Sequence, residues 1–303
     1  MRATAFLLVL LGCLLAASGQ EGVVDSLDQV LRSEQSDTAR VETLLALSSE
    51  FYRTDAGKAR QLAQEARDLA ERIDHKSGLA KAYKALGMTY YFQNNWVDCL
   101  VQWKLALETF QAINDLNGVS NMLNNLGAVH FNGGDDKAAL DYYLESLRVA
   151  EQNDDPLRTV TALVNIGTVY LSKDSSKPLA FKYYKRALPI SKALGDNDAI
   201  GTCAVNLGEL FMQERATIDS IKLFNPDSAL FYFEMALDAY RNSATGNVPF
   251  ALKSIGRVYA VRNDFAKAIQ YQTEAYQIAM AMDAKLEMAQ SLLSLAETYE
   301  KKG

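Results

Sequence analysis

From residue 37 onward, the chain repeats one arrangement of apolar, small and aromatic positions about every 40 residues. In each repeat a Leu or Ile precedes a small residue, mostly Gly, and a ring side chain follows three residues later. The small residues stand at positions 48, 87, 127, 167, 208, 256 and 296, which are 39, 40, 40, 41, 48 and 40 residues apart. Spacings of three and four residues place side chains on one face of a helix. Each repeat is therefore predicted to begin with a helix, here called helix A.

A second set of small positions follows in the first six repeats. A small residue is followed four positions later by a mostly bulky one, and three positions after that by another small one. The sets are Ala59-Ala63-Ala66, Cys99-Trp103-Ala106, Ala139-Tyr143-Ser146, Ala180-Tyr184-Ala187, Ala229-Phe233-Ala236 and Ala268-Gln272-Ala275. From each set to the next small position of helix A the distance is 27 or 28 residues. We predict a helix B at each set, and an all-α fold in which A and B cross at their small residues.

Polar and small residues recur 13 positions before the small residue of helix A. They are Asp74, Asn114, Asp154, Gly195, Ser243 and Asp283. Since these residue types are favoured at helix N-caps, helix A is predicted to start there.

The two patterns, L-G-x-x-Y in helix A and A-x-x-x-Y-x-x-A in helix B, resemble tetratricopeptide (TPR) repeats of the variety with a 40-residue period. The resemblance covers residues 37–303 and implies a right-handed superhelix of about six and a half helix-turn-helix repeats. The last repeat ends at Lys301-Lys302-Gly303 without a helix B, and we favour the interpretation that the chain is a fragment.

The 48-residue spacing comes from an insertion, Gln213–Asp227, between helices A and B of repeat five. Insertions in helical repeat arrays lie at one edge of the array. Two interpretations stay open, a tolerated surface loop and an extension of a binding surface.

The N-terminus has the layout of a secretory signal. Arg2 precedes the apolar run Ala5–Leu15, and the small residues Ala16 to Gly19 follow. We predict a signal peptide over residues 1–19, a short amphipathic helix and linker over 20–36, and export to the periplasm or cell envelope. In the less favoured alternative, Leu10 to Cys13 is a lipobox and Cys13 carries a lipid anchor.

Composition narrows the function classes. The 303 residues carry a net charge of −6, and Lys and Arg are scattered, whereas a nucleic-acid surface needs clustered basic residues. The chain has no H-E-x-x-H, C-x-x-C or G-x-S-x-G pattern. We expect no catalytic residue, no metal and no cofactor. His130 is interpreted as a core residue in an aromatic position, and Cys99 and Cys203 as small buried hydrophobes.

The signal-like N-terminus, Val24-Asp25-Ser26-Leu27 and the stretch Asp37–Val41, followed by the repeats, resemble the exported sensor half of certain bacterial membrane signalling proteins. In those proteins a transmembrane helix and a kinase, cyclase or DNA-binding output domain follow. The resemblance implies a non-catalytic sensor, with membrane association through a segment beyond Gly303; an output enzyme in a longer parent protein stays open. The alternative is a free-standing exported TPR scaffold for envelope complexes.

In TPR proteins helix A lines a concave groove that binds a protein or peptide, and positions 2, 5, 6, 9 and 12 point inward when the small residue is position 8. The residues at these positions that we select as the binding groove are Lys81, Lys84, Tyr91, Asn121, Asn124, Asn125, Phe131, Thr161, Asn165, Thr168, Asn206, Glu209, Lys253 and Arg257.

Asn125, Asn165 and Asn206 share position 6, where an amide both donates to and accepts from a peptide backbone. Tyr91, Phe131, Leu171 and Met212, all at position 12, are proposed apolar anchors. The open alternative is that the Asn side chains bridge neighbouring helices. The carboxylate clamp of chaperone-binding TPR domains is matched only in part, so a clamp is not expected. The sequence specifies neither the ligand nor the oligomeric state.

Overall fold

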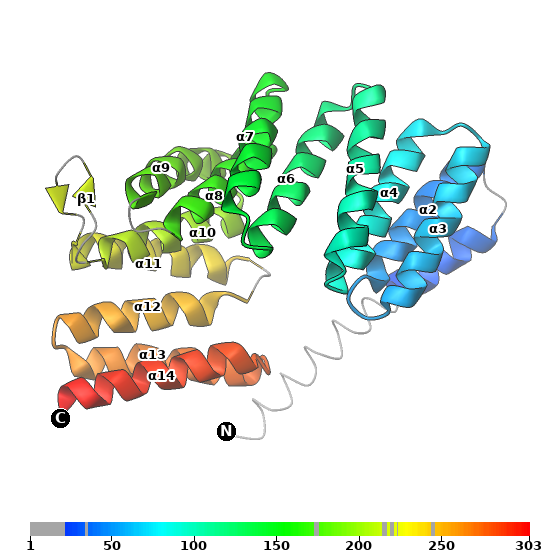
Figure 1. Cartoon of the computed structure of the whole chain (residues 1–303). Helices are drawn as coiled ribbons and strands as arrows, with labels where there is room; N and C mark the ends of the chain where they lie inside the picture. The colour runs from blue at the N-terminus through cyan, green and yellow to red at the C-terminus, as the bar shows by residue number, and fades with distance from the viewer. Residues whose placement is uncertain are drawn as a thin grey trace. The chain divides into compact units, whose positions relative to one another are not determined.

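The structure, a computed structural model, describes residues 22–33, 36–172, 176–213, 217–218, 221–222, 224–243 and 246–303. The predicted signal peptide, Cys13 included, lies outside the described residues. The chain divides into two compact units, Met1–Asn153 and Asp154–Gly303. Apart from one short strand pair, the described segments with regular structure are helical, and consecutive helices form antiparallel pairs (Figure 1). The predicted all-α fold of paired helices is confirmed.

The first unit starts with a helix over residues 22–32. The helices that follow are α2 (Asp37–Phe51), α3 (Ala56–Arg72), α4 (Lys76–Phe92), α5 (Trp96–Ala112), α6 (Leu116–Asn132) and α7 (Asp136–Gln152). Each packs against the next, and α2 also contacts α4. Helices α2, α4 and α6 are the predicted A helices; α3, α5 and α7 are the B helices.

The second unit holds helices α8 (Pro156–Leu171), α9 (Lys177–Leu194), α10 (Asn197–Phe211), α11 (Pro226–Arg241), α12 (Val248–Val261), α13 (Phe265–Ala281) and α14 (Lys285–Lys302). Here the A helices are α8, α10, α12 and α14. Neighbours along the chain pack together, and α8 also contacts α10 as α12 contacts α14.

Each A helix meets its B helix at the predicted small residues. A Cβ atom added to Gly87 would lie 2.1 Å from the Trp103 ring, and at Gly127 it would lie 2.7 Å from Tyr143. Gly167 and Gly208 stand similarly close to rings. These distances are shorter than van der Waals contact, so only glycine allows the two helices to approach this closely.

In the first and sixth repeats, polar side chains at the crossing of helices A and B take the place of the glycine–ring contact. In the first, Ser48 donates to the carbonyl of Ala59 at 2.7 Å, and Ala63 replaces the ring. In the sixth, the fully buried Gln272 lies against Gly256 and donates to the Ser294 hydroxyl at 2.8 Å. The crossing therefore persists where the sequence lacks an aromatic residue.

The predicted N-caps of the A helices are wrong by one or more residues. Asp74, Asn114 and Asp154 have φ angles of 52°, 55° and 47°, so they adopt the left-handed conformation. Asp283 and Gly195 do the same, with φ angles of 51° and 66°. Asn, Asp and Gly tolerate this conformation, which commonly ends a helix. These five residues therefore terminate the B helices.

The residue that follows each of them is the N-cap of the next helix. The side chain of Asp115 accepts from the backbone N–H of Gly118 at 2.9 Å, and Asp155 and Asp196 cap α8 and α10 in the same way. The sixth predicted cap, Ser243, is also displaced, because α12 begins after Asn247.

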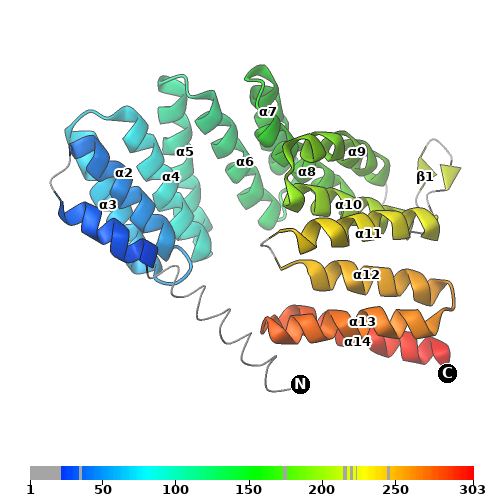
Figure 2. The same cartoon turned by 180° about the vertical axis from the view of Figure 1, so that it is seen from behind.

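The insertion of repeat five lies between α10 and α11, where the spacing predicts it. Its described part includes the antiparallel strands β1 (Thr217–Ile218) and β2 (Ile221–Lys222). Strand β1 contacts α9, and both views show it beside that helix at the edge of the second unit (Figures 1 and 2).

The glycine crossing generates a stability prediction. Gly87→Ala forces a methyl group against the Trp103 ring, which is 2% exposed and is held by a hydrogen bond from its Nε1 to the Lys84 carbonyl at 3.1 Å. We expect this overpacking to cost about 1–3 kcal/mol, more than the ~1 kcal/mol gain in helix propensity. Urea unfolding followed by circular dichroism measures the change.

Gly133→Ala is the matched control, because Gly133 has a φ of −79° and an added Cβ would meet only backbone oxygens at 3.4 and 3.5 Å. Equal stability of the two variants would contradict the role of the crossing.

Candidate functional site

Every residue predicted for the binding groove lies on an A helix. In the first unit, Lys81, Lys84 and Tyr91 lie on α4, and Asn121, Asn124, Asn125 and Phe131 lie on α6. In the second unit, Thr161, Asn165 and Thr168 lie on α8, Asn206 and Glu209 on α10, and Lys253 and Arg257 on α12. Below, the A-helix face means the surface of each unit formed by positions 2, 5, 6, 9 and 12 of its A helices.

The amides of α6 include unused hydrogen-bonding capacity. The side-chain oxygen of Asn121 is buried and has no partner among the described residues. The Asn125 amide forms no hydrogen bond with another described residue, whereas Asn124 does have a polar or electrostatic interaction within the protein. On α4, Lys81 pairs with Glu42 of α2 at 2.7 Å. The A-helix face of this unit therefore carries both a paired ion, Lys81, and an amide oxygen without a hydrogen bond, that of Asn121. A buried acceptor that lacks a hydrogen bond lowers the stability of the fold.

Tyr91 contributes more to the core than the sequence suggests. Its ring packs against Trp96 and Trp103 with centroid distances of 5.3 and 5.6 Å, and its hydroxyl accepts from Asn132 of α6 at 3.1 Å. It thus joins α4, α5 and α6.

A cavity of about 340 Å³ opens between α2 and α4 of the first unit, at the C-terminal ends of these helices. We call it the first-unit cavity. Its lining residues are Ser49, Glu50, Tyr52, Arg53, Thr54, Met88 and Phe92. The rings of Tyr52 and Phe92 stack at 6.2 Å, and burial raises the pKa of Tyr52 to about 12. The tyrosine is therefore a neutral hydrogen-bonding group at physiological pH.

The groove prediction missed all of these lining residues. Ser49 and Tyr52 occupy positions 9 and 12 of the first repeat, and Met88 occupies position 9 of the second. Applying the same positions to every repeat would have found these three.

On α8 and α10 the predicted residues have mixed roles. The Thr168 hydroxyl lies 3.0 Å from the Tyr184 hydroxyl of α9, and Thr161 donates to the carbonyl of Leu157 at 2.9 Å. Asn165 has a contact within the protein. The Asn206 amide, in contrast, has none among the described residues.

Glu209, Lys253 and Arg257 come together between α10 and α12, as the position numbering implies. Arg257 pairs with Glu209 at 2.8 Å, and Lys253 donates to Gln290 of α14 at 2.6 Å. Burial, and then the charge of Arg257, lower the pKa of Lys253, while Glu209 partly restores it. The Glu209 carboxylate therefore stabilises two cations on this face.

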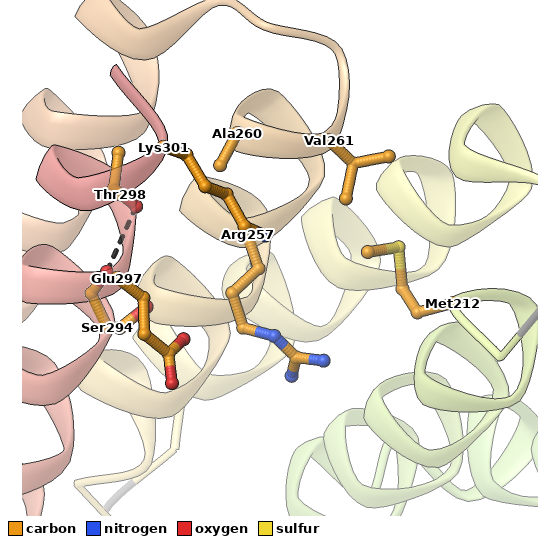
Figure 3. A pocket seen from close by; sticks show the side chains of 8 residues that line it. All are labelled: Met212, Arg257, Ala260, Val261, Ser294, Glu297, Thr298 and Lys301. Atoms are coloured by element: carbon orange, nitrogen blue, oxygen red, sulfur yellow. Dashed lines mark hydrogen bonds between the residues drawn. The ribbon is translucent and has the colours of Figure 1, made fainter. Parts of the chain in front are cut away.

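The second unit also has a cavity, of about 250 Å³, next to this cluster (Figure 3). Its lining residues are Met212, Arg257, Ala260, Val261, Ser294, Glu297, Thr298 and Lys301. Arg257 was selected for the groove, and Met212 was proposed as an apolar anchor at position 12. In Figure 3 the Arg257 guanidinium and the Glu297 carboxylate lie on the same side of the cavity. Both signs of charge line this second-unit cavity.

The remaining candidate chemistry is mostly structural. Cys99 and Cys203 are buried, as predicted, and burial raises the pKa of each thiol to about 12. His130 is not a core residue: its side chain is 25% exposed, and its ring stacks on Tyr142 at 5.3 Å. In the described parts of the chain, no group of three or more His, Cys, Asp or Glu side chains could hold a metal ion. Nor does any helix in those parts have the length and apolar content to cross a bilayer.

Comparisons with known proteins agree with this architecture. Residues 119–152, which cover most of α6 and all of α7, match the sequence model of a tetratricopeptide repeat. The chain has the fold of TPR proteins. No curated protein matches the sequence.

Three solved structures illustrate the likeness. BtubC from P. vanneervenii is 20% identical, with a TM-score of 0.61 over 80% of this chain and 92% of that one. Pseudomonas aeruginosa PilF is 18% identical, with a TM-score of 0.59 over 84% and 97%. The Rap conjugation regulator of plasmid pLS20, solved with the Phr* peptide, is 17% identical, with a TM-score of 0.55 over 87% and 70%. At these identities the likeness shows the fold alone.

The charge cluster on α10 and α12 generates a pH-dependent prediction. Glu209→Gln removes the carboxylate that favours the charged Lys253, so the pKa of Lys253 falls further below its value in the unfolded chain. We expect the free energy of unfolding to fall by about 0.5–1 kcal/mol near pH 7, because Glu209 and Lys253 are partly exposed to solvent. A lysine whose folded pKa is lowered penalises folding at low pH and gains stability as pH rises toward 10.5.

The deficit of Glu209→Gln should therefore shrink between pH 7 and pH 10, and also with added salt. Urea titrations across this range measure it, with Glu108→Gln on the exposed side of α5 as the control. A deficit that is independent of both pH and salt would rule out the electrostatic explanation.

Proposed function

We propose that this protein is a non-catalytic protein- or peptide-binding domain whose ligand contacts the A-helix faces. The observation that carries the proposal is the repeated amide at position 6. Asn125 and Asn206 share this position on α6 and α10, and neither amide has a partner among the described residues. An amide that folding leaves unused is available to a ligand backbone, and each such hydrogen bond contributes about 1 kcal/mol.

Two further observations support a peptide or protein as the ligand. Each unit has a cavity between neighbouring A helices, lined mostly from positions 9, 12 and 13, so that either unit offers a pocket to a side chain of a bound segment. In addition, the similar Rap regulator is solved in complex with a peptide. The alternative role of the amides, bridging neighbouring helices, fits Asn165 better than Asn125 or Asn206, because Asn165 does have a contact within the protein.

The finer part of the proposal concerns location and role. Export is supported by the signal-like N-terminus, in which a cation, an apolar run and small residues follow one another. A sensory role in a bacterial membrane-bound signalling protein is supported by the order of this signal, Val24–Leu27 and the repeats. A free-standing envelope scaffold is the alternative. The reading frame after Gly303 separates the two, because a sensor requires a further membrane-spanning segment of about 20 apolar residues.

Site-specific photocrosslinking in the native host tests the proposed binding face. A benzoylphenylalanine replaces Asn125 or Asn206, and control crosslinkers replace Lys104 and Lys182, which are exposed on the B helices α5 and α9. We expect a discrete crosslinked product from the two Asn positions and none from the two Lys positions. Products from the Lys positions alone, or from no position, would contradict binding on the A-helix face.

Mass spectrometry of the mature N-terminus in fractions of the same host tests export. We expect an envelope or periplasmic protein that begins near Gln20. A chain that begins at an acylated Cys13 would favour the lipid-anchor alternative. An intact Met1 in the cytosolic fraction would contradict export.

A further inference from the structure

We propose that the first-unit cavity binds a peptide segment in which a large apolar side chain is flanked by Asp or Glu. This inference rests on the proposed function and adds to it the chemistry of the ligand. It depends on two features, the apolar wall of the cavity and the cations of the segment from Arg53 to Arg60.

The apolar wall comes from two repeats. Tyr52 of the first repeat stacks on Phe92 of the second with an angle of 22° between the ring planes, and Met88 lines the same space. Rings and a thioether are adaptable partners for an aromatic or long aliphatic side chain. The volume of about 340 Å³ lies at the lower end of ligand pockets, which are ~300–1,000 Å³. This wall therefore suits one large side chain.

Arg53 lines the cavity, and two further cations, Lys58 and Arg60, lie on α3 after the turn that follows α2. The Arg53 guanidinium lies 5.4 Å from the centroid of the Phe92 ring, Lys58 Nζ lies 4.0 Å from that of Phe51, and the Arg60 guanidinium lies 5.6 Å from that of Tyr90. Arg60 also donates to Gln93 at 3.4 Å. In the described part of the chain, none of the three forms an ion pair with a carboxylate.

The corresponding turn of the second unit shows that this is unusual. Arg262 and Lys267 also lie over a ring, that of Tyr259, but Arg262 pairs with Asp227 and Lys267 with Asp264. The first repeat thus retains positive charge that the sixth neutralises internally, although the whole chain carries a charge of −6. Such a local surplus favours an acidic ligand through charge complementarity.

Two acidic residues, Glu50 and Asp55, lie in the same segment, against the three cations Arg53, Lys58 and Arg60. Glu50 lines the cavity but has a contact of its own within the protein, and Asp55 accepts from the backbone N–H of Lys58 as the cap of α3. Because three separate cations follow the turn, they match acidic side chains within a segment better than one C-terminal carboxylate.

Arg53 also stands just after the C-terminus of α2, where a cation stabilises the helix dipole. A purely structural role for Arg53 would affect stability without any selectivity among ligands. Ligand selectivity is therefore the quantity to measure.

Fluorescence anisotropy with the purified full chain and fluorescein-labelled Gly-Ser peptides tests the inference. The probes carry one internal Phe-Asp, Phe-Asn or Ala-Asp pair, and a fourth ends in a free C-terminal Phe. We expect the Phe-Asp peptide to bind at least about tenfold more tightly than the other three, a difference of about 1.4 kcal/mol. Equal binding of Phe-Asp and Phe-Asn, preference for the C-terminal Phe, or no binding of Phe-Asp at millimolar concentration would overturn the inference.

Two variants test whether the selectivity for Phe-Asp arises in the first-unit cavity. Arg53→Gln should reduce the affinity for Phe-Asp to that for Phe-Asn, and Met88→Ala should weaken both peptides. Arg262 is the matched cation over a ring in the second unit, and Arg262→Gln should leave the affinity for both peptides unchanged. Selectivity that survives Arg53→Gln would overturn the inference. If crosslinking at Asn125 and Asn206 succeeds while these peptides fail, the ligand class is wrong but the proposed binding function stands.

Discussion

The approach of a glycine backbone to a side-chain ring is the contact on which the rest of the structure depends. At Gly87, Gly127, Gly167 and Gly208 a ring from the B helix occupies the space that a Cβ atom would need. This contact fixes the distance between the two helices of a pair and the rotation of helix A about its axis. Because position 8 faces helix B, positions 5 and 12, three and four residues away, lie near the same crossing, as the packing of Tyr91 on Trp103 shows, and position 9 turns further from it. The packing core therefore determines which side chains a ligand can meet.

The turns keep this arrangement in register from one repeat to the next. A residue in the left-handed conformation ends one helix and the next residue caps the following helix, as in the pairs Asn94-Asn95, Asn114-Asp115 and Asn263-Asp264. With these two-residue signals, each helix from α3 to α7 has 17 residues. In the second unit the lengths vary more, from 14 residues in α12 to 18 in α9 and α14. Equal lengths mean that equivalent positions recur at the same depth on successive A helices.

The fold was predictable from the sequence because the pattern of small residues and rings reports a contact within one repeat. The helix starts were not, because Asn and Asp serve both as left-handed helix ends and as N-caps, and the two functions occupy adjacent positions such as Asn114 and Asp115. Among the selected residues, Glu209 and Arg257 do meet, since they lie on the facing sides of neighbouring A helices. The repeat positions identify part of each lining, such as Tyr52 and Met88. The cavity itself could not be predicted, because the space between Tyr52 and Phe92 depends on how two repeats pack and not on the pattern within one repeat.

Selectivity in such an array comes from the differences between repeats, since the crossing contact is common to most of them. The two cation-bearing turns illustrate this. Asp227 is the last residue of the insertion of repeat five and pairs with Arg262 in the next repeat. The inserted segment therefore brings a carboxylate to a turn that would otherwise resemble that of Arg53. An insertion that leaves the core contacts of α10 and α11 intact can therefore change the charge at the turn between α12 and α13. The same scaffold can in this way present a positive edge in one unit and a neutralised edge in the other.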